Sequence, residues 1–124
     1  MRVLLSIKPE FAEKILSGQK RFEFRKVVFK NQNVRSVVIY ASSPVQKVVG
    51  EFDVQAILSM PPEDLWCKTF KYSGIEKDYF DQYFLGRETA FALKISSPQE
   101  YEKPFDLKKL GIKVPPQSFC YLAE

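Results

Sequence analysis

The sequence contains no histidine among its 124 residues. Histidine is the side chain whose ordinary pKa places its charge change between about pH 5 and 8, so acid–base chemistry here must use lysine, carboxylates, tyrosine or serine. Histidine-containing zinc sites are excluded as well. The two cysteines, Cys67 and Cys120, are far apart and form no Cys-x-x-Cys motif. We therefore expect reduced thiols, no metal site and no cofactor.

Long apolar runs are also missing. No window approaches the roughly 18 apolar residues of a membrane-spanning helix, and the N-terminus lacks the cleavage site of a signal peptide, so we expect a cytoplasmic protein. The length suits one domain, and we see no repeat or linker within residues 1–124. A content of 45% hydrophobic residues predicts a real core, and the net charge of +4 permits a polyanionic partner.

The hydrophobic pattern predicts a mixture of strands and helices. Strands are expected over residues 2–7, 20–26, 36–41, 47–58, 90–95 and 119–122, with a bent edge at 101–104. Helices are expected after Pro9, after Pro61–Pro62 and after Ser73, which precedes Glu76 with capping-box spacing. Gly50 is expected at a bulge or a close approach of two strands. Strands and helices do not alternate regularly, so we predict an α+β fold: a small, mixed, mainly antiparallel β-barrel of about six strands with inserted helices.

The segment LSGQKRFEFRK (16–26) concentrates charge where a helix gives way to a strand. Its candidate ligand-binding residues are Gly18, Lys20, Glu23 and Arg25. A strand alternates its faces, so Glu23 and Arg25 lie opposite the two phenylalanines. Two cations beside a carboxylate can bind a phosphate or the edge of a base. The alternative is a plain ion pair between Glu23 and Arg25 on the protein surface.

A second group lies where the strand over residues 36–41 ends. Tyr40 is followed by the turn residues Ser42 and Ser43, whose hydroxyls and amides can bind an anion, and Lys47 begins the next strand. The alternative is an ordinary turn with a surface lysine. A third candidate, Ser118, follows two prolines near the C-terminus.

Six aromatic residues accompany the middle helices. Trp66, Phe70, Tyr79, Phe80, Tyr83 and Phe84 have the spacing of buried helix faces. We interpret them as core, with one or two at the edge of a cleft available to stack on a base.

Four segments together carry a family resemblance. The Gly18-x-Lys20-x-x-Glu23-x-Arg25 motif, followed by IYASSPVQKVVGEF (39–52), SGIEKDYFDQYFLGR (73–87) and PPQSFCYL (115–122), resembles the ASCH domain, a branch of the PUA-like barrels, over essentially the whole chain. The resemblance implies a β-barrel with a cleft between barrel and helices and an association with RNA or nucleotides. Some ASCH relatives resemble ribonucleases that use a tyrosine, a lysine and a serine. The matching positions are Tyr40, Lys47 (or Gln46, in the neighbouring register) and Ser118.

Two functions follow as hypotheses. The favoured one is a module that binds RNA or a modified nucleotide, in which Lys20 and Arg25 neutralise phosphate and Glu23 contacts a base edge. It is favoured because no nucleophile–base pair is visible in the sequence. The alternative is a small metal-independent hydrolase: a ribonuclease that uses Lys20 or Lys47 with Tyr40 and Ser118, or an amidohydrolase acting on N-acylcytidine. Glu23 stands where the amidohydrolases carry a threonine nucleophile, which weighs against that form. A monomer is favoured slightly.

Overall fold

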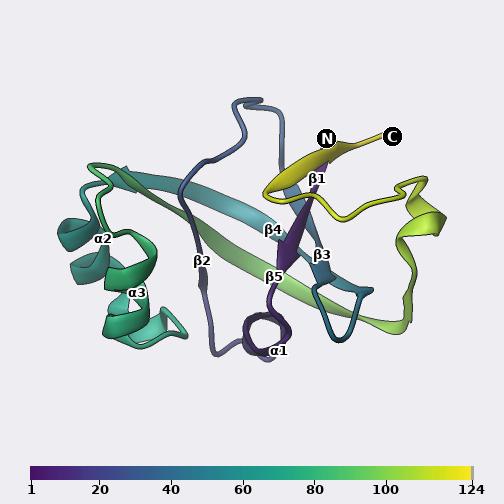
Figure 1. The fold of residues 1–124 in the computed structure, drawn as a ribbon, viewed down its shortest axis with the longest axis horizontal. Coiled ribbons are helices and arrows are strands. Elements are labelled where there is room, and N and C mark those ends of the chain that lie inside the picture. Colours follow the sequence, from purple (N-terminus) through teal and green to yellow (C-terminus); the bar gives the residue numbers. More distant parts are fainter. Residues whose placement is uncertain (124) are drawn as a thin grey trace.

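The computed structural model describes residues 1–123, which form six strands, three α-helices and two short 3-10 helices (Figure 1). In chain order these are β1 (Arg2–Ile7), α1 (Pro9–Leu16), β2 (Phe22–Arg25), β3 (Ser36–Ala41), β4 (Lys47–Met60), α2 (Pro62–Thr69), η1 (Phe70–Tyr72), α3 (Lys77–Tyr83), β5 (Ala90–Phe105), η2 (Leu107–Leu110) and β6 (Phe119–Leu122). No helix within this part of the chain is long and apolar enough to cross a membrane.

The six strands form one mixed sheet in the order β2-β5-β4-β3-β1-β6. The β1–β3 pair is parallel and all other pairs are antiparallel. The α+β class is therefore confirmed, but the closed barrel is not, because no ladder joins the edge strands β2 and β6 within residues 1–123. A strand of four residues such as β2 offers few backbone groups to a second neighbour, and among the described residues β2 pairs only with β5.

The strands β4 and β5 run side by side across the molecule (Figure 1). Gly50 lies where their register shifts, and a Cβ atom at this position would be 2.5 Å from the carbonyl oxygen of Gln99 and 2.7 Å from Cδ2 of Leu16. The expected close approach at Gly50 is confirmed. The strand expected over residues 90–95 and the edge at 101–104 are parts of one continuous strand, β5.

One expected helix start is wrong. Helix α3 begins at Lys77 with Glu76 as the residue before it, and no side chain caps it. The hydroxyl of Ser73 instead lies 3.2 Å from the carbonyl oxygen of Phe70 and 3.0 Å from that of Ile75. Ser73 therefore stabilises the loop before α3 and makes no capping box.

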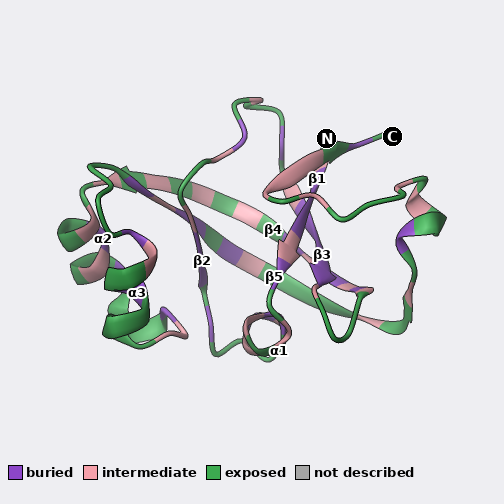
Figure 2. Ribbon diagram, in the orientation of Figure 1, coloured by how far each residue is buried: buried purple, intermediate pink, exposed green. Residues whose placement is uncertain are grey.

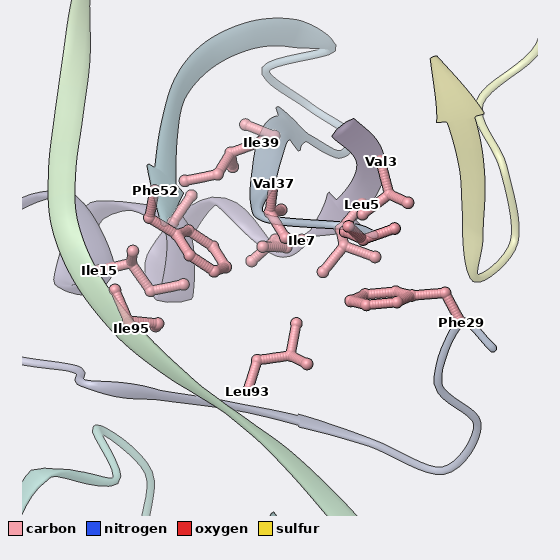
Figure 3. Close-up of a cluster of buried hydrophobic side chains, with 13 residues drawn as sticks. Val3, Leu5, Ile7, Ile15, Phe29, Val37, Ile39, Phe52, Leu93 and Ile95 are labelled. Carbon is pink, nitrogen blue, oxygen red and sulfur yellow. The ribbon is translucent and has the colours of Figure 1, made fainter. Parts of the chain in front are cut away.

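Buried residues lie along all the central strands (Figure 2). Their side chains form clusters on both faces of the sheet. In one cluster, Ile15 of α1 packs with Phe52 of β4 and Ile95 of β5, and Val37 and Ile39 belong to it (Figure 3). A second cluster joins α2 and α3 to β2 and β5; its buried residues include Leu65, Phe80, Phe84, Phe24 and Ala92. The third holds Leu4, Val38, Tyr40, Val48, Leu107 and Leu122. Helix α1 therefore lies against the sheet on one side of β2, and α2 and α3 pack on the other.

Candidate functional site

The turn between α1 and β2 places a lysine inside the protein. Gly18 follows the helix with φ +87°, and the backbone N–H of Lys20 then donates to the carbonyl of Lys14. This turn directs the Lys20 side chain inward, where it is only 2% exposed. Its Nζ donates to the carbonyl oxygen of Ser73 at 2.6 Å.

The loop before α3 is shaped around this lysine. Gly74 has φ +71°, and a Cβ atom at this position would lie 2.6 Å from both Cβ and Cγ of Lys20. The Lys20 ammonium lies 4.7 Å from the ring centre of Phe24 and 5.4 Å from that of Phe11. Cation–π contacts of this kind stabilise a charged ammonium away from water. They replace only part of the hydration that the Lys20 ammonium loses on burial.

Burial lowers the pKa of Lys20 to about 8, while the nearby Glu23 carboxylate opposes this effect and Lys14 adds to it. Burial disfavours the charged form because an ammonium loses its hydration. A lysine with this pKa exchanges its proton close to neutral pH, as a general base or acid must.

Glu23 and Arg25 lie on the same side of β2, as the alternation of the strand predicts. Glu23 is 6% exposed, and its Oε2 lies 3.4 Å from Nη1 of Arg25. The Nη2 group of Arg25 donates to the carbonyl oxygen of Ser118 at 2.8 Å and lies 3.1 Å from the Ser118 hydroxyl. The ion pair that we considered as the plain alternative is therefore present, but it lies partly buried and holds the C-terminal loop.

These residues surround a cavity of about 210 Å³, which we call the Arg25 pocket. Lys20, Glu23 and Arg25 line it together with Ser6, Lys8, Phe11, Tyr79, Tyr83 and Gln117, among others. The hydroxyl of Ser6 donates to the carbonyl of Pro116 at 2.8 Å, which fixes the loop at one wall. The cavity is smaller than the roughly 300–1,000 Å³ of pockets for drug-sized ligands, so it suits one phosphate group or one base.

Burial raises the pKa of the Tyr83 phenol, and the charge of Arg25 counteracts this shift. Tyr83 therefore stays protonated at neutral pH. Within residues 1–123, no three histidine, cysteine, aspartate or glutamate residues lie close enough to hold a metal ion.

Six of the predicted site residues lie outside the lining of this pocket, and one of them, Ser118, is linked to it through its contact with Arg25. Gly18 supports the turn, and Ser42 and Ser43 belong to the turn after β3. Tyr40 is buried in the cluster with Leu107 and Leu122, and Lys47 makes an ion pair with Asp106. Tyr40 nevertheless pairs in register with the pocket residue Ser6 on the neighbouring strand β1. The assignment of functional roles to all these residues stays a prediction.

The site also includes residues that were not predicted from the sequence as site residues. Ser73 and Gly74 form the loop that receives Lys20, and the Ser-Gly pair is a turn signal that the capping pattern obscured. Tyr79 and Tyr83 line the pocket, whereas we interpreted the six aromatic residues as core with one or two of them at the edge of a cleft. Nothing in their spacing separates a pocket-lining ring from a buried one.

A family model, a related sequence and solved structures all match this chain to the ASCH domain. The family model of the ASCH domain matches residues 5–113. The "ASCH domain-containing ribonuclease" of Zymomonas mobilis is 32% identical over 122 residues, which cover 96% of this chain and 82% of that protein. The crystal structure of ASCH from Zymomonas mobilis superposes with a TM-score of 0.91 at 30% identity, covering 99% of this chain and 88% of that one. Crystal structures of a Tyr-to-Phe and a Ser-to-Ala variant of the Zymomonas protein match similarly, with TM-scores of 0.91 and 0.90.

A protein with another name also contains a similar segment. The "Large ribosomal subunit protein uL22" of Ureaplasma parvum is 32% identical over 121 residues, which cover 97% of this chain but 39% of that protein. The chain thus spans well under half the length of this relative. The match of the family model over residues 5–113, together with the near-full-length similarity to the Zymomonas protein, shows that this chain belongs to the ASCH domain family.

Proposed function

We propose that this chain is a metal-independent ribonuclease that binds single-stranded RNA in the Arg25 pocket. The observation that carries the proposal is the 32% identity to a protein named as an ASCH domain-containing ribonuclease, over 96% of this chain and 82% of that protein. The pocket supports it, because a buried lysine with a lowered pKa and an arginine line it, and the Ser118 hydroxyl lies 3.1 Å from that arginine.

Arg25 is suited to hold the phosphate. Its guanidinium has five N–H donors, more than its contacts with Glu23 and Ser118 require. Arginine binds phosphate oxygens through paired, charge-assisted hydrogen bonds. A phosphate bound there lies beside the Ser118 hydroxyl, which can donate to a second oxygen.

The cleavage step uses the RNA's own nucleophile. The 2′-hydroxyl attacks the adjacent phosphorus, a P–O bond forms, and the bond to the 5′-oxygen breaks. The base takes the 2′-hydroxyl proton and an acid protonates the leaving 5′-oxygen, which yields a 2′,3′-cyclic phosphate and a 5′-hydroxyl. We assign the base to the neutral form of Lys20, and Arg25 stabilises the charge that develops on the phosphate.

Tyr40 and Lys47 define a competing location for the same chemistry. The family resemblance supports a tyrosine and a lysine role at these two positions, and a tyrosine and a serine were replaced in the variants of the Zymomonas protein. Ser118 belongs to both arrangements. Substitutions at Lys20 and at Lys47 therefore decide which lysine takes part.

The first test is cleavage of end-labelled single-stranded RNA in EDTA. We expect Lys20→Met to lower the rate by about 100-fold or more, the typical contribution of a general base, and Ser118→Ala to lower it as well. Lys30→Met, at an exposed lysine outside the pocket, is the matched control. If Tyr40→Phe and Lys47→Met abolish cleavage while Lys20→Met does not, the reaction belongs to the Tyr40 location. If the wild type cleaves no RNA in EDTA, the chain is not a metal-independent ribonuclease.

A non-catalytic RNA-binding module is the second candidate. It is favoured by the fact that the Lys20 ammonium is already held by Ser73 and the Arg25 guanidinium by Glu23 and Ser118, as in a rigid binding site. In this case the wild type binds an RNA oligonucleotide without cleaving it, and Lys20→Ala and Arg25→Ala weaken binding by at least about tenfold, or 1.4 kcal/mol. N4-acetylcytidine in the same assay tests the amidohydrolase form.

A further inference from the structure

A second and larger hollow lies on the other side of the turn that carries Lys20. We call it the Arg21 groove; its volume is about 700 Å³, and it is lined by the α1–β2 turn, the end of α2, η1 and residues 94–98 of β5. We propose that this groove binds the backbone and bases of the RNA strand that flanks the segment held in the Arg25 pocket. The inference rests on the proposed function of that pocket and extends it to a longer substrate.

The charged side chains that line the groove are positive. Among residues 1–123, its lining includes five cations, Lys20, Arg21, Lys68, Lys71 and Lys94, and no aspartate or glutamate. All but Lys20 are exposed, so they can reach phosphate groups without first breaking buried contacts. On a chain whose net charge is only +4, this lining concentrates positive charge in one hollow. Such grooves bind a nucleic-acid backbone by releasing its counterions.

Two exposed aromatic rings accompany the cations. Phe70 is 51% exposed and Tyr72 46% exposed, although both belong to the short helix η1. The Arg21 guanidinium carbon lies 4.1 Å from the centre of the Tyr72 ring. Our expectation that Phe70 is core is therefore wrong, because its ring faces solvent. Aromatic rings beside cations are typical of grooves that bind single-stranded nucleic acid, where bases stack on the rings.

The groove and the Arg25 pocket are neighbours. Lys20 lines both, and a third hollow of about 390 Å³, which is also lined by Glu10 and Glu76, shares Phe70 with the groove and Phe11, Ile75 and Tyr79 with the pocket. An extended strand can therefore run from the groove past the loop at Ser73 into the pocket. Ser97, on the rim of the groove, has φ +50°. A non-glycine residue in this conformation is strained, and strain of this kind gathers at functional sites.

The charge alone also fits an acidic protein segment. The exposed rings of Phe70 and Tyr72 favour RNA, because bases present flat faces to stack and acidic side chains do not. We therefore assign the groove to single-stranded RNA and treat an acidic peptide as the outcome that would overturn the assignment.

The test compares a groove variant with a control of equal charge. The groove variant carries Lys71→Gln and Lys94→Gln; the control carries Lys30→Gln and Lys103→Gln, at exposed lysines outside the groove. Affinities for a trinucleotide and a ten-nucleotide single-stranded RNA are measured by fluorescence anisotropy over a range of salt concentrations, with the 2′-hydroxyls methylated to prevent cleavage.

The groove variant should bind the ten-mer at least about tenfold more weakly near 0.1 M salt, and the slope of log K against log salt should fall by about 1.4, or 0.7 per lost phosphate contact. Its affinity for the trinucleotide should be unchanged. A Phe70→Ala, Tyr72→Ala variant should weaken the ten-mer without changing this slope, because stacking carries no charge.

The proposal is overturned if the groove variant and the control lose equal affinity, or if the ten-mer binds no more tightly than the trinucleotide. It is also overturned if poly-glutamate displaces the ten-mer more effectively than unlabelled RNA does. Failure of the proposed function looks different. If wild-type protein cleaves no RNA while ten-mer binding depends on Lys71 and Lys94, the groove stands and the ribonuclease does not.

Discussion

At the scale of single residues, Lys20 is the most consequential side chain. A lysine is rarely buried, and here its stem packs against Gly74 while its ammonium reaches the Ser73 carbonyl. The charged form is costly because burial removes its hydration. The protein therefore holds a reactive group at the expense of stability, as functional sites often do.

This cost predicts a pH dependence of stability. The pKa of Lys20 is about 8 in the folded protein, whereas the ordinary value for a lysine is 10.5, so between these values the unfolded chain binds more protons and stability rises with pH. Relative to a Lys20→Met variant, the wild type should gain about 3 kcal/mol from pH 8 to pH 10.5. The free energies of unfolding of both proteins are measured in urea across this range, so that the titrations of other groups cancel. A constant difference between pH 7 and 10 would contradict a buried, neutralisable Lys20.

At the scale of elements, most boundaries follow from local patterns. The strands over residues 36–41 and 119–122 have the bounds that β-branched and aromatic residues indicate, and Pro9 and Gly18 mark the two ends of α1. The length of β5 does not follow, because Pro98 and Pro104 argue against a strand. Pairing explains it. Strand β2 covers only Phe91–Lys94 of β5, so the prolines fall where that side of the strand lacks a partner among the described residues.

The close approach of β4 and β5 gives an element-scale prediction. Gly50→Ala would place a methyl group against the Gln99 carbonyl and the Leu16 side chain, and relieving the clash requires a shift of backbone. We expect a loss of about 2–3 kcal/mol in the free energy of unfolding. Gly111→Ala is the control, because no described atom beyond its chain neighbours lies within 4 Å of its added Cβ and only the strain of φ +74° remains. Thermal and urea unfolding measure both; equal losses would show that contact at Gly50 is not the cause.

At the scale of the whole molecule, side-chain contacts link the edge strands β2 and β6, which no backbone ladder joins among the described residues. Arg25 at the end of β2 bonds to Ser118, the residue before β6, and Phe29 packs against Phe119 with ring centres 5.8 Å apart. The two edge strands therefore approach each other without a ladder. Local sequence patterns predict strands and their faces but not whether distant edges meet, which explains why the closed barrel was not confirmed.

The same limit applies to the site. Lys20, Glu23 and Arg25 lie within one short segment, so strand alternation suffices to place them together. Ser118 joins them from 93 positions away along the chain. Tyr40 does not join them, because neighbouring residues of a strand point to opposite faces of the sheet. Ile39 belongs to the cluster that contains α1, and Tyr40 packs in a different cluster, with Leu107. Alternation along β3 predicts the direction of the Tyr40 side chain only once it is known which face of β3 packs against α1.

The hydrogen bond between Arg25 and the Ser118 carbonyl predicts which strand loses protection when the bond is removed: β6. Arg25→Met removes a charged hydrogen bond to the Ser118 carbonyl, a contact worth about 1.5–3 kcal/mol. Amide hydrogens of Phe119–Leu122 should then exchange about tenfold faster or more, while those of β4 keep their protection. Arg21→Met, which removes a cation from the same segment without touching Ser118, is the control. Unchanged exchange in β6 would show that the bridge contributes nothing to this edge.

The contact between Lys20 and Gly74 also has an evolutionary consequence. The space beside the Gly74 backbone is filled by the methylene chain of Lys20, so a side chain at one position excludes a long side chain at the other. Because Cβ of Lys20 is itself one of the atoms at 2.6 Å, a shorter side chain at position 20 does not make room, and only a glycine there would. We expect ASCH relatives that carry any side chain at the position of Lys20 on the same backbone to keep a glycine at the position of Gly74.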